Sequence, residues 1–108
     1  MESLSAKLKK INSEISLILR KTDISRLPAK ARDQLAQLNQ NLQDARIYLN
    51  DYELSETREE QVKSAKNAKK YLGKASTNVL AASSADIFKP ADVAQLTAEL
   101  EEIIVSLK

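Results

Sequence analysis

Three residue types that often carry chemistry or cross-links are missing from this chain. Its 108 residues include no Cys, no His and no Trp. Without Cys, disulfides and thiolate metal sites are excluded and the redox compartment is not revealed. Without His, the commonest general base and metal ligand is absent, and Ser or Thr has no His to activate it. We therefore expect a non-catalytic protein without a cofactor, a metal or a small-molecule substrate.

Turn-forming and aromatic residues are scarce too. The chain has one Gly, two Pro and 4% aromatic residues. Strands joined by tight turns usually need more Gly and Pro than this, so the composition argues against them. The few aromatics predict a core made of aliphatic side chains and Ala. The length is that of one domain, so we expect residues 1–108 to fold as a single unit.

Long hydrophobic runs are absent as well. No segment approaches the ~20 apolar residues of a membrane span. The N-terminal run from Ile15 to Leu19 is interrupted by Ser16 and is too short for a signal peptide. The net charge of +2 does not by itself call for nucleic acid or a membrane. We expect a cytoplasmic protein, and a leader removed before residue 1 stays an open alternative.

The clearest pattern present is a heptad stripe within residues 28–54, with apolar residues alternately four and three apart. The stripe consists of Ala31, Leu35, Leu38, Leu42, Ala45, Leu49 and Tyr52. This spacing predicts an amphipathic helix that buries one face against other helices. The positions beside the stripe, such as Gln34, Asn41 and Tyr48, carry no charge. Paired coiled coils usually place charges there, so a helical bundle is favoured.

The same alternation of four- and three-residue spacings predicts three more helices, at about residues 2–21, 58–82 and 90–107. Their stripes are Leu4, Leu8, Ile11, Ile15 and Ile18; Ala65, Ala68, Leu72, Ala75, Val79 and Ala82; and Val93, Leu96, Leu100, Ile103 and Leu107. Pro28 and Pro90 are suited to open helices, and Thr57 with Glu60 fits a capping box. Gly73 lies inside the third helix, where we expect a close neighbour or a bend.

Four helices with short connections predict an all-α, antiparallel up-down-up-down four-helix bundle. The second and third helices have about 25 residues and the others about 20, so the long pair should form a hairpin that overhangs. Its tip, roughly residues 47–62, would be only half covered. The main alternative is one continuous helix through residues 55–57.

The tip carries the first candidate site, a protein-docking patch of Ile47, Tyr48, Asp51 and Leu54. Ile47 and Leu54 are seven residues apart and should project from the outer face of their helix. Asp44, Asp51 and Glu53 supply an acidic rim, a composition typical of interaction surfaces. The alternatives are ordinary exposed apolar residues or a tip covered by the start of the first helix.

The second candidate site is a lysine stripe on the third helix, and it is a possible site for anions. Its members are Lys63, Lys66, Lys70 and Lys74. They should point to water, where they could follow a phosphate backbone or an acidic protein. A solvated outer helix face is the alternative. We expect Tyr71 to point elsewhere, and only Lys63 has an acidic partner four residues earlier, Glu59.

These features predict a non-catalytic interaction or assembly-factor module that binds a protein partner or a second copy of itself through the tip. The alternative is a nucleic-acid-associated accessory protein that uses the lysine stripe. Membrane association through the amphipathic first helix is the weaker reading, because the bundle core needs the apolar face of that helix.

Overall fold

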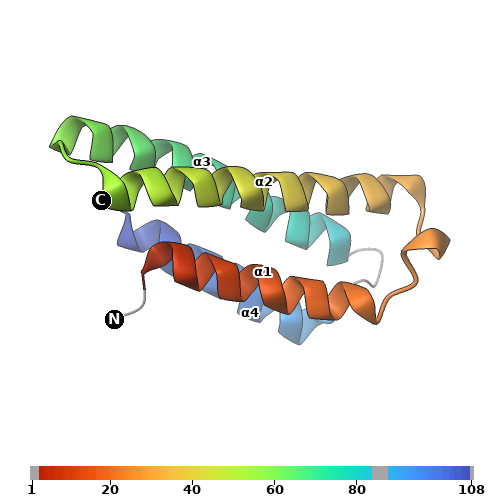
Figure 1. The fold of residues 1–108 in the computed structure, drawn as a ribbon. Helices are drawn as coiled ribbons and strands as arrows, with labels where there is room; N and C mark the ends of the chain where they lie inside the picture. Colours follow the sequence, from red (N-terminus) through yellow and green to blue (C-terminus); the bar gives the residue numbers. More distant parts are fainter. Residues whose placement is uncertain (1–2, 84–87, 108) are drawn as a thin grey trace.

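The computed structural model describes residues 3–83 and 88–107 and confirms the four-helix bundle. Successive helices run antiparallel, and the described residues contain no strand (Figure 1). The helices are α1 (Leu4–Arg20), α2 (Ala29–Leu54), α3 (Arg58–Ser83) and α4 (Pro90–Ser106), with a short 3-10 turn at Ile24–Arg26. Every predicted bound that lies in the described residues is within two residues of the observed one.

The helices begin where local hydrogen bonding predicts. The Ser3 hydroxyl accepts from the Ala6 backbone N–H at 3.1 Å at the start of α1. The Thr57 hydroxyl accepts from the Glu60 N–H at 3.2 Å at the start of α3, which satisfies a donor that the helix leaves free. Pro28 has an extended backbone and precedes α2, whereas Pro90 is the first residue of α4. Residues 55–57 therefore form a turn, and the continuous-helix alternative is wrong.

The core consists of the predicted apolar stripes. On α2 and α3 every stripe residue except Tyr52 is buried, and Tyr52 is half-buried. On α1 and α4 the central stripe residues are buried, while Leu4, Ile18 and Val93 pack at the edges. Phe88, which precedes α4, is also buried, although no stripe includes it. Phe88 lies in a segment without helical periodicity, so the stripes gave no signal for it.

The closest association in the bundle is between α2 and α3, which make the most extensive helix contact. Four buried alanines give α3 a narrow inner face: Ala65, Ala68, Ala75 and Ala82. Small side chains let neighbouring helix backbones approach. Of the two alternatives expected for Gly73, the close neighbour is wrong, because a Cβ atom added there would meet nothing within 4 Å. The bend stays a prediction.

A polar seam borders this contact on its outer side. Asn78 on α3 is only 5% exposed. Its side-chain oxygen accepts from the Asn41 amide at 2.7 Å, and its side-chain NH₂ donates to Gln34 Oε1 at 2.8 Å. Gln34 and Asn41 are two of the uncharged flanking positions of the α2 stripe, and both are half-buried. A buried polar group with fixed partners specifies the register of two helices, because a slip would leave it unpaired.

The molecule is elongated, with extents of 47 × 25 × 18 Å. Figure 1 shows the α2–α3 turn projecting past the start of α1, so the hairpin does overhang. The overhang is not free on every side. Glu53 near the end of α2 accepts from the Ser5 backbone N–H at 2.8 Å and from the Ser5 hydroxyl at 3.1 Å. This carboxylate sits at the N-terminus of α1, where negative charge is favourable, and it ties α1 to the base of the tip.

The seam predicts that Asn78→Ala destabilises the protein by about 1–3 kcal/mol, because Asn41 and Gln34 lose their partner while they stay half-buried. Thermal unfolding followed by circular dichroism should show a fall in Tm of several degrees. The control is Asn39→Ala, which removes an exposed amide from α2 and should leave Tm within about a degree. Equal Tm values for the two variants would show that the seam contributes nothing.

Candidate functional site

The overhanging tip contains a groove between α2 and α3 with a volume of about 550 Å³. Three of the four predicted docking residues line it, namely Tyr48, Asp51 and Leu54. From α3 and the turn the lining residues are Ser55, Glu60, Lys63, Ser64 and Asn67. We call these residues, together with the adjacent Ile47, the tip surface. The groove has an apolar wall, carboxylates and one ammonium group, so it can contact apolar and charged groups at once.

Two large apolar side chains of the tip surface lie open to solvent. Leu54 is 79% exposed and Ile47 is 57% exposed. Both project from α2 opposite its buried stripe, as their spacing predicts. Ile47 lies outside the groove, on the outward side of α2, whereas Leu54 forms part of the groove wall. Of the predicted acidic rim, Asp51 lines the groove. Glu53 instead faces α1 through its hydrogen bonds to Ser5.

Tyr48 forms an aromatic pair with Tyr71 of α3. The two ring centroids are 5.6 Å apart and the rings are nearly parallel, at 6°. The Lys70 and Lys74 ammonium groups lie 5.7 and 5.2 Å from the Tyr71 centroid, within reach of a cation–π contact. The expectation that Tyr71 points away from the lysine stripe is therefore wrong. Tyr71 is one helical step from the stripe, so its long side chain reaches both Tyr48 and the lysines.

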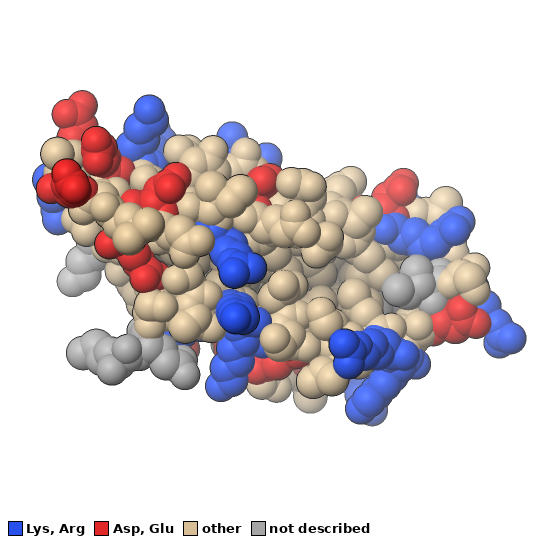
Figure 2. All heavy atoms as spheres, viewed as in Figure 1, with Lys and Arg blue, Asp and Glu red and all other residues tan. Residues whose placement is uncertain are grey.

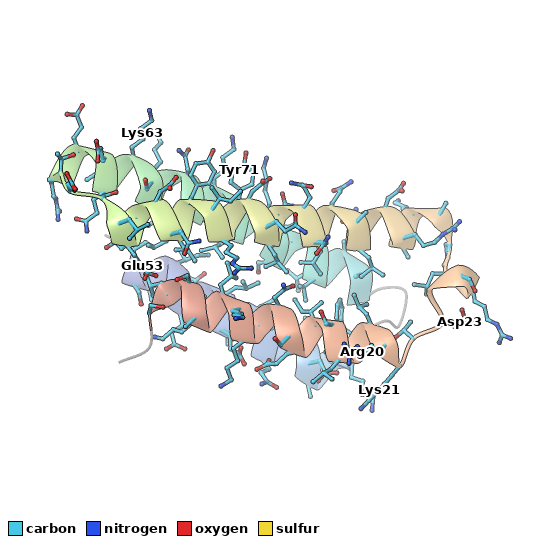
Figure 3. The ribbon with its side chains drawn as sticks, in the orientation of Figure 1. Arg20, Lys21, Asp23, Glu53, Lys63 and Tyr71 are labelled. Carbon is cyan, nitrogen blue, oxygen red and sulfur yellow. The ribbon has the colours of Figure 1, made fainter. Side chains whose placement is uncertain are left out.

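All four stripe lysines, Lys63, Lys66, Lys70 and Lys74, are exposed on α3. The two ion pairs formed within residues 3–83 and 88–107 are Lys7–Glu102 and Arg26–Asp23, so the expected Lys63–Glu59 pair is not formed. Lys63 lines the tip groove, and Lys74 lines a second groove of about 410 Å³ beside the Asn41–Asn78 seam. Lys63 and Tyr71 project on the side of the hairpin away from α1 and α4 (Figure 3).

The two predicted sites therefore adjoin on one face of the α2–α3 hairpin. Lys63 belongs to both the tip groove and the lysine stripe, and the Tyr48–Tyr71 pair joins the tip surface to Lys70 and Lys74. Lys66 takes part in neither groove. The sequence predicted two distinct sites because the periodicity of one helix does not show which of its faces meets another helix.

A cluster of charged residues lies on another face, between α1 and α4. Glu14 of α1 faces Glu99 of α4, and the Gln95 side-chain NH₂ donates to both, at 3.4 and 2.9 Å. Partial burial and the nearby Glu99 charge raise the pKa of Glu14, and Lys10 acts in the opposite direction. Lys7 pairs with Glu102 at 3.4 Å beside this cluster. Glu99 and Glu102 thus both lie on the side of α4 that faces α1.

The described residues hold no group of three or more His, Cys, Asp or Glu side chains arranged to bind a metal ion. Within the same residues, no helix combines the length and apolarity that crossing a bilayer requires. The apolar face of α1, which was the basis of the membrane alternative, is turned into the core through Leu8, Ile11 and Ile15.

Comparison of the chain with protein-family models, with curated proteins and with solved structures gave no significant match. Its function is therefore inferred from the tip surface, the lysine stripe and the charges of this chain.

The Glu14–Glu99 cluster predicts a pH-dependent stability difference. A folded-state pKa above the unfolded value means that the proton binds better to the folded protein, so the charged Glu14 destabilises the fold above that pKa. Glu14→Gln should therefore raise Tm by a degree or two at neutral pH. The gain should vanish at about pH 3, where Glu14 is protonated in both states.

The control is Glu101→Gln, an exposed carboxylate of α4 that belongs to neither ion pair. It should not change Tm at either pH. A Tm for Glu14→Gln below that of the wild-type protein at neutral pH would show that the Glu14 charge is stabilised, contrary to this account.

Proposed function

We propose that this chain is a non-catalytic protein-interaction or assembly-factor module that binds a partner through the tip surface. The observation that carries the proposal is the exposure of Leu54 and Ile47, at 79% and 57%, beside a groove of about 550 Å³. A cavity of this size between two helices can receive a side chain of a partner.

The energetics of such a contact are favourable. Burying a Leu or Ile side chain is worth about 1.5–3 kcal/mol, so these two residues can supply a large part of a micromolar affinity. Tyr48 adds aromatic surface that is already held in place by Tyr71, and a rigid aromatic loses little entropy on binding. Asp51 and Glu60 give the groove charges that can select a partner.

The proposal predicts that Ile47→Arg with Leu54→Arg abolishes partner binding without changing the fold, because both side chains are exposed. The measurement is a pull-down from lysate of the native host, washed at about 50 and 500 mM salt, with recovered protein and nucleic acid identified. Apolar contacts persist at high salt, whereas contacts between exposed charges are screened. The wild-type protein should therefore retain a protein at 500 mM salt that the double variant does not.

The matched control is Leu17→Arg with Val105→Arg. These residues are 56% and 63% exposed and lie on α1 and α4, not on the α2–α3 hairpin that carries the tip surface. This control should retain the partner, and all three proteins should melt within about two degrees of one another. Retention of the same partner by the tip variant would place the binding site elsewhere. Loss of the fold in that variant would show that Ile47 and Leu54 stabilise the core.

The second candidate function is nucleic-acid association through the lysine stripe. It is favoured by one observation: Lys70 and Lys74 lie over Tyr71, and cations beside an aromatic ring are a feature of single-strand binding surfaces. Asp51 and Glu60 lie in the groove that Lys63 lines, which opposes a polyanion there. The tip proposal therefore stands first.

This candidate predicts a steep salt dependence. Four phosphate contacts to a single strand give a slope of about −3 in log K against log salt, or a roughly fiftyfold loss between 50 and 200 mM salt. Fluorescence anisotropy with a labelled single strand of about 20 nucleotides measures it. Lys63→Gln with Lys66→Gln, Lys70→Gln and Lys74→Gln should remove the binding, whereas Lys9→Gln with Lys10→Gln on α1 should not. No binding at 50 mM salt would eliminate this candidate.

A further inference from the structure

The exposed charges of this protein separate toward its two ends. At the tip, residues 50–60 contain five carboxylates and one arginine, all exposed. The carboxylates are Asp51, Glu53, Glu56, Glu59 and Glu60. We call this end the acidic pole, and its formal charge is −4. Figure 2 shows the acidic side chains gathered at the end of the molecule where α2 meets α3.

The opposite end carries the opposite charge. It holds the connection from α1 to α2 and the start of α4 (Figure 1). Six exposed cations lie there among the described residues, against Asp23, Asp33 and Asp92, so the formal charge of these residues is +3. The cations are Arg20, Lys21, Arg26, Lys30, Arg32 and Lys89. We call this end the basic pole, and Figure 3 shows Arg20 and Lys21 there, far from Glu53.

The two poles cannot neutralise each other within one molecule. The long axis is 47 Å, and the screening length at physiological salt is about 8 Å. Among the pairs formed within residues 3–83 and 88–107, only Arg26 has a carboxylate partner in its own pole, Asp23 at 3.1 Å, and that pair is exposed. The remaining charge of each pole is therefore available to a molecule that approaches that end.

The poles are also matched in their apolar groups. The acidic pole surrounds Leu54, which is 79% exposed. The basic pole also contains exposed apolar residues, namely Pro28 and Ala29 at the start of α2 and Pro90 and Ala91 at the start of α4. Exposed apolar groups with charged residues near them are typical of protein interfaces.

We propose that the tip surface binds the basic pole of a second copy of this chain, so that copies associate end to end. This inference rests on the proposed function, because it names the occupant of the same tip surface. The contact joins two different surfaces, so each added copy leaves one acidic and one basic pole free. Such a heterologous contact propagates as an open chain unless its geometry closes a ring.

The small area that this contact can bury limits its affinity. The cross-section of 25 by 18 Å limits the buried area to about 450 Å² on each copy, below the ~800 Å² per partner of a stable interface. The association is therefore weak and transient, and it depends on salt because its rim is charged. It becomes populated at high protein concentration or where copies are held close together.

The test uses charge reversal at each pole. The tip variant is Asp51→Lys with Glu56→Lys and Glu59→Lys, which leaves the capping residue Glu60 in place. The pole variant is Lys30→Glu with Arg32→Glu and Lys89→Glu, all near helix N-termini where carboxylates are favourable. Sedimentation velocity is measured from about 10 μM to 1 mM at 20 and 300 mM salt, after circular dichroism shows that both variants keep the wild-type melting temperature.

The wild-type protein should self-associate at 20 mM salt and do so at least tenfold more weakly at 300 mM. Each variant alone should lose association at least tenfold, because its two ends then carry like charges. An equimolar mixture should regain it, since every contact between a tip variant and a pole variant pairs opposite charges. The matched control, Lys66→Glu with Lys70→Glu and Lys74→Glu, reverses as many charges on the side of α3 and should stay within about threefold of the wild type.

A wild-type protein that stays monomeric at 1 mM and 20 mM salt overturns the proposal, as does a mixture that fails to regain association. If the Leu54-dependent pull-down still recovers a protein in that case, the tip surface is a docking site for a different basic partner and the proposed function stands. If neither experiment shows Leu54-dependent binding, both proposals fail.

Discussion

The close packing of α2 against α3 is the constraint on which the rest of the structure depends. The alanines of α3 have small side chains, so α2 can approach closely and the two helices are in contact over most of their length. This contact places the Asn78 seam and the Tyr48–Tyr71 pair along one outer edge. It also leaves α1 and α4 to cover only the other side of the hairpin. The open face and the overhanging tip are consequences of that asymmetry.

The sequence predicted the fold well, because the fold depends on a local repeat. Spacings of three and four residues identified the helices, the buried stripes and the exposed positions of Ile47 and Leu54. Features that depend on how two helices meet were missed or misjudged. Tyr71 stacks on Tyr48 only because of the way α3 is rotated against α2. The Asn78 seam had a partial signal in the uncharged flanks of the α2 stripe, but nothing in one helix identifies its partner in another.

The same limit applies to the charges. Along the chain, the carboxylates of residues 51–60 and the cations of residues 20–32 are short mixed runs without an evident relation. The α1–α2 connection and the α2–α3 turn lie at opposite ends of α2. The two runs therefore lie at opposite ends of the bundle. A nearly neutral protein thus presents strongly different potentials to a partner at each end. A net charge of +2 conceals this arrangement.

The attachment of α1 bears on the order in which the bundle comes apart. This helix makes far less extensive contacts than α2 and α3 make with each other, and its first turn is held by the Glu53 carboxylate. Free energies of local opening follow the density of such contacts, so α1 belongs to the least stable cooperative unit and the α2–α3 hairpin to the most stable. Release of α1 would uncover apolar surface of α2 and α4 while the hairpin stayed folded. The bundle is thus a stable α2–α3 pair that α1 joins through weaker contacts. The Glu53–Ser5 hydrogen bonds that hold the start of α1 lie at the base of the tip.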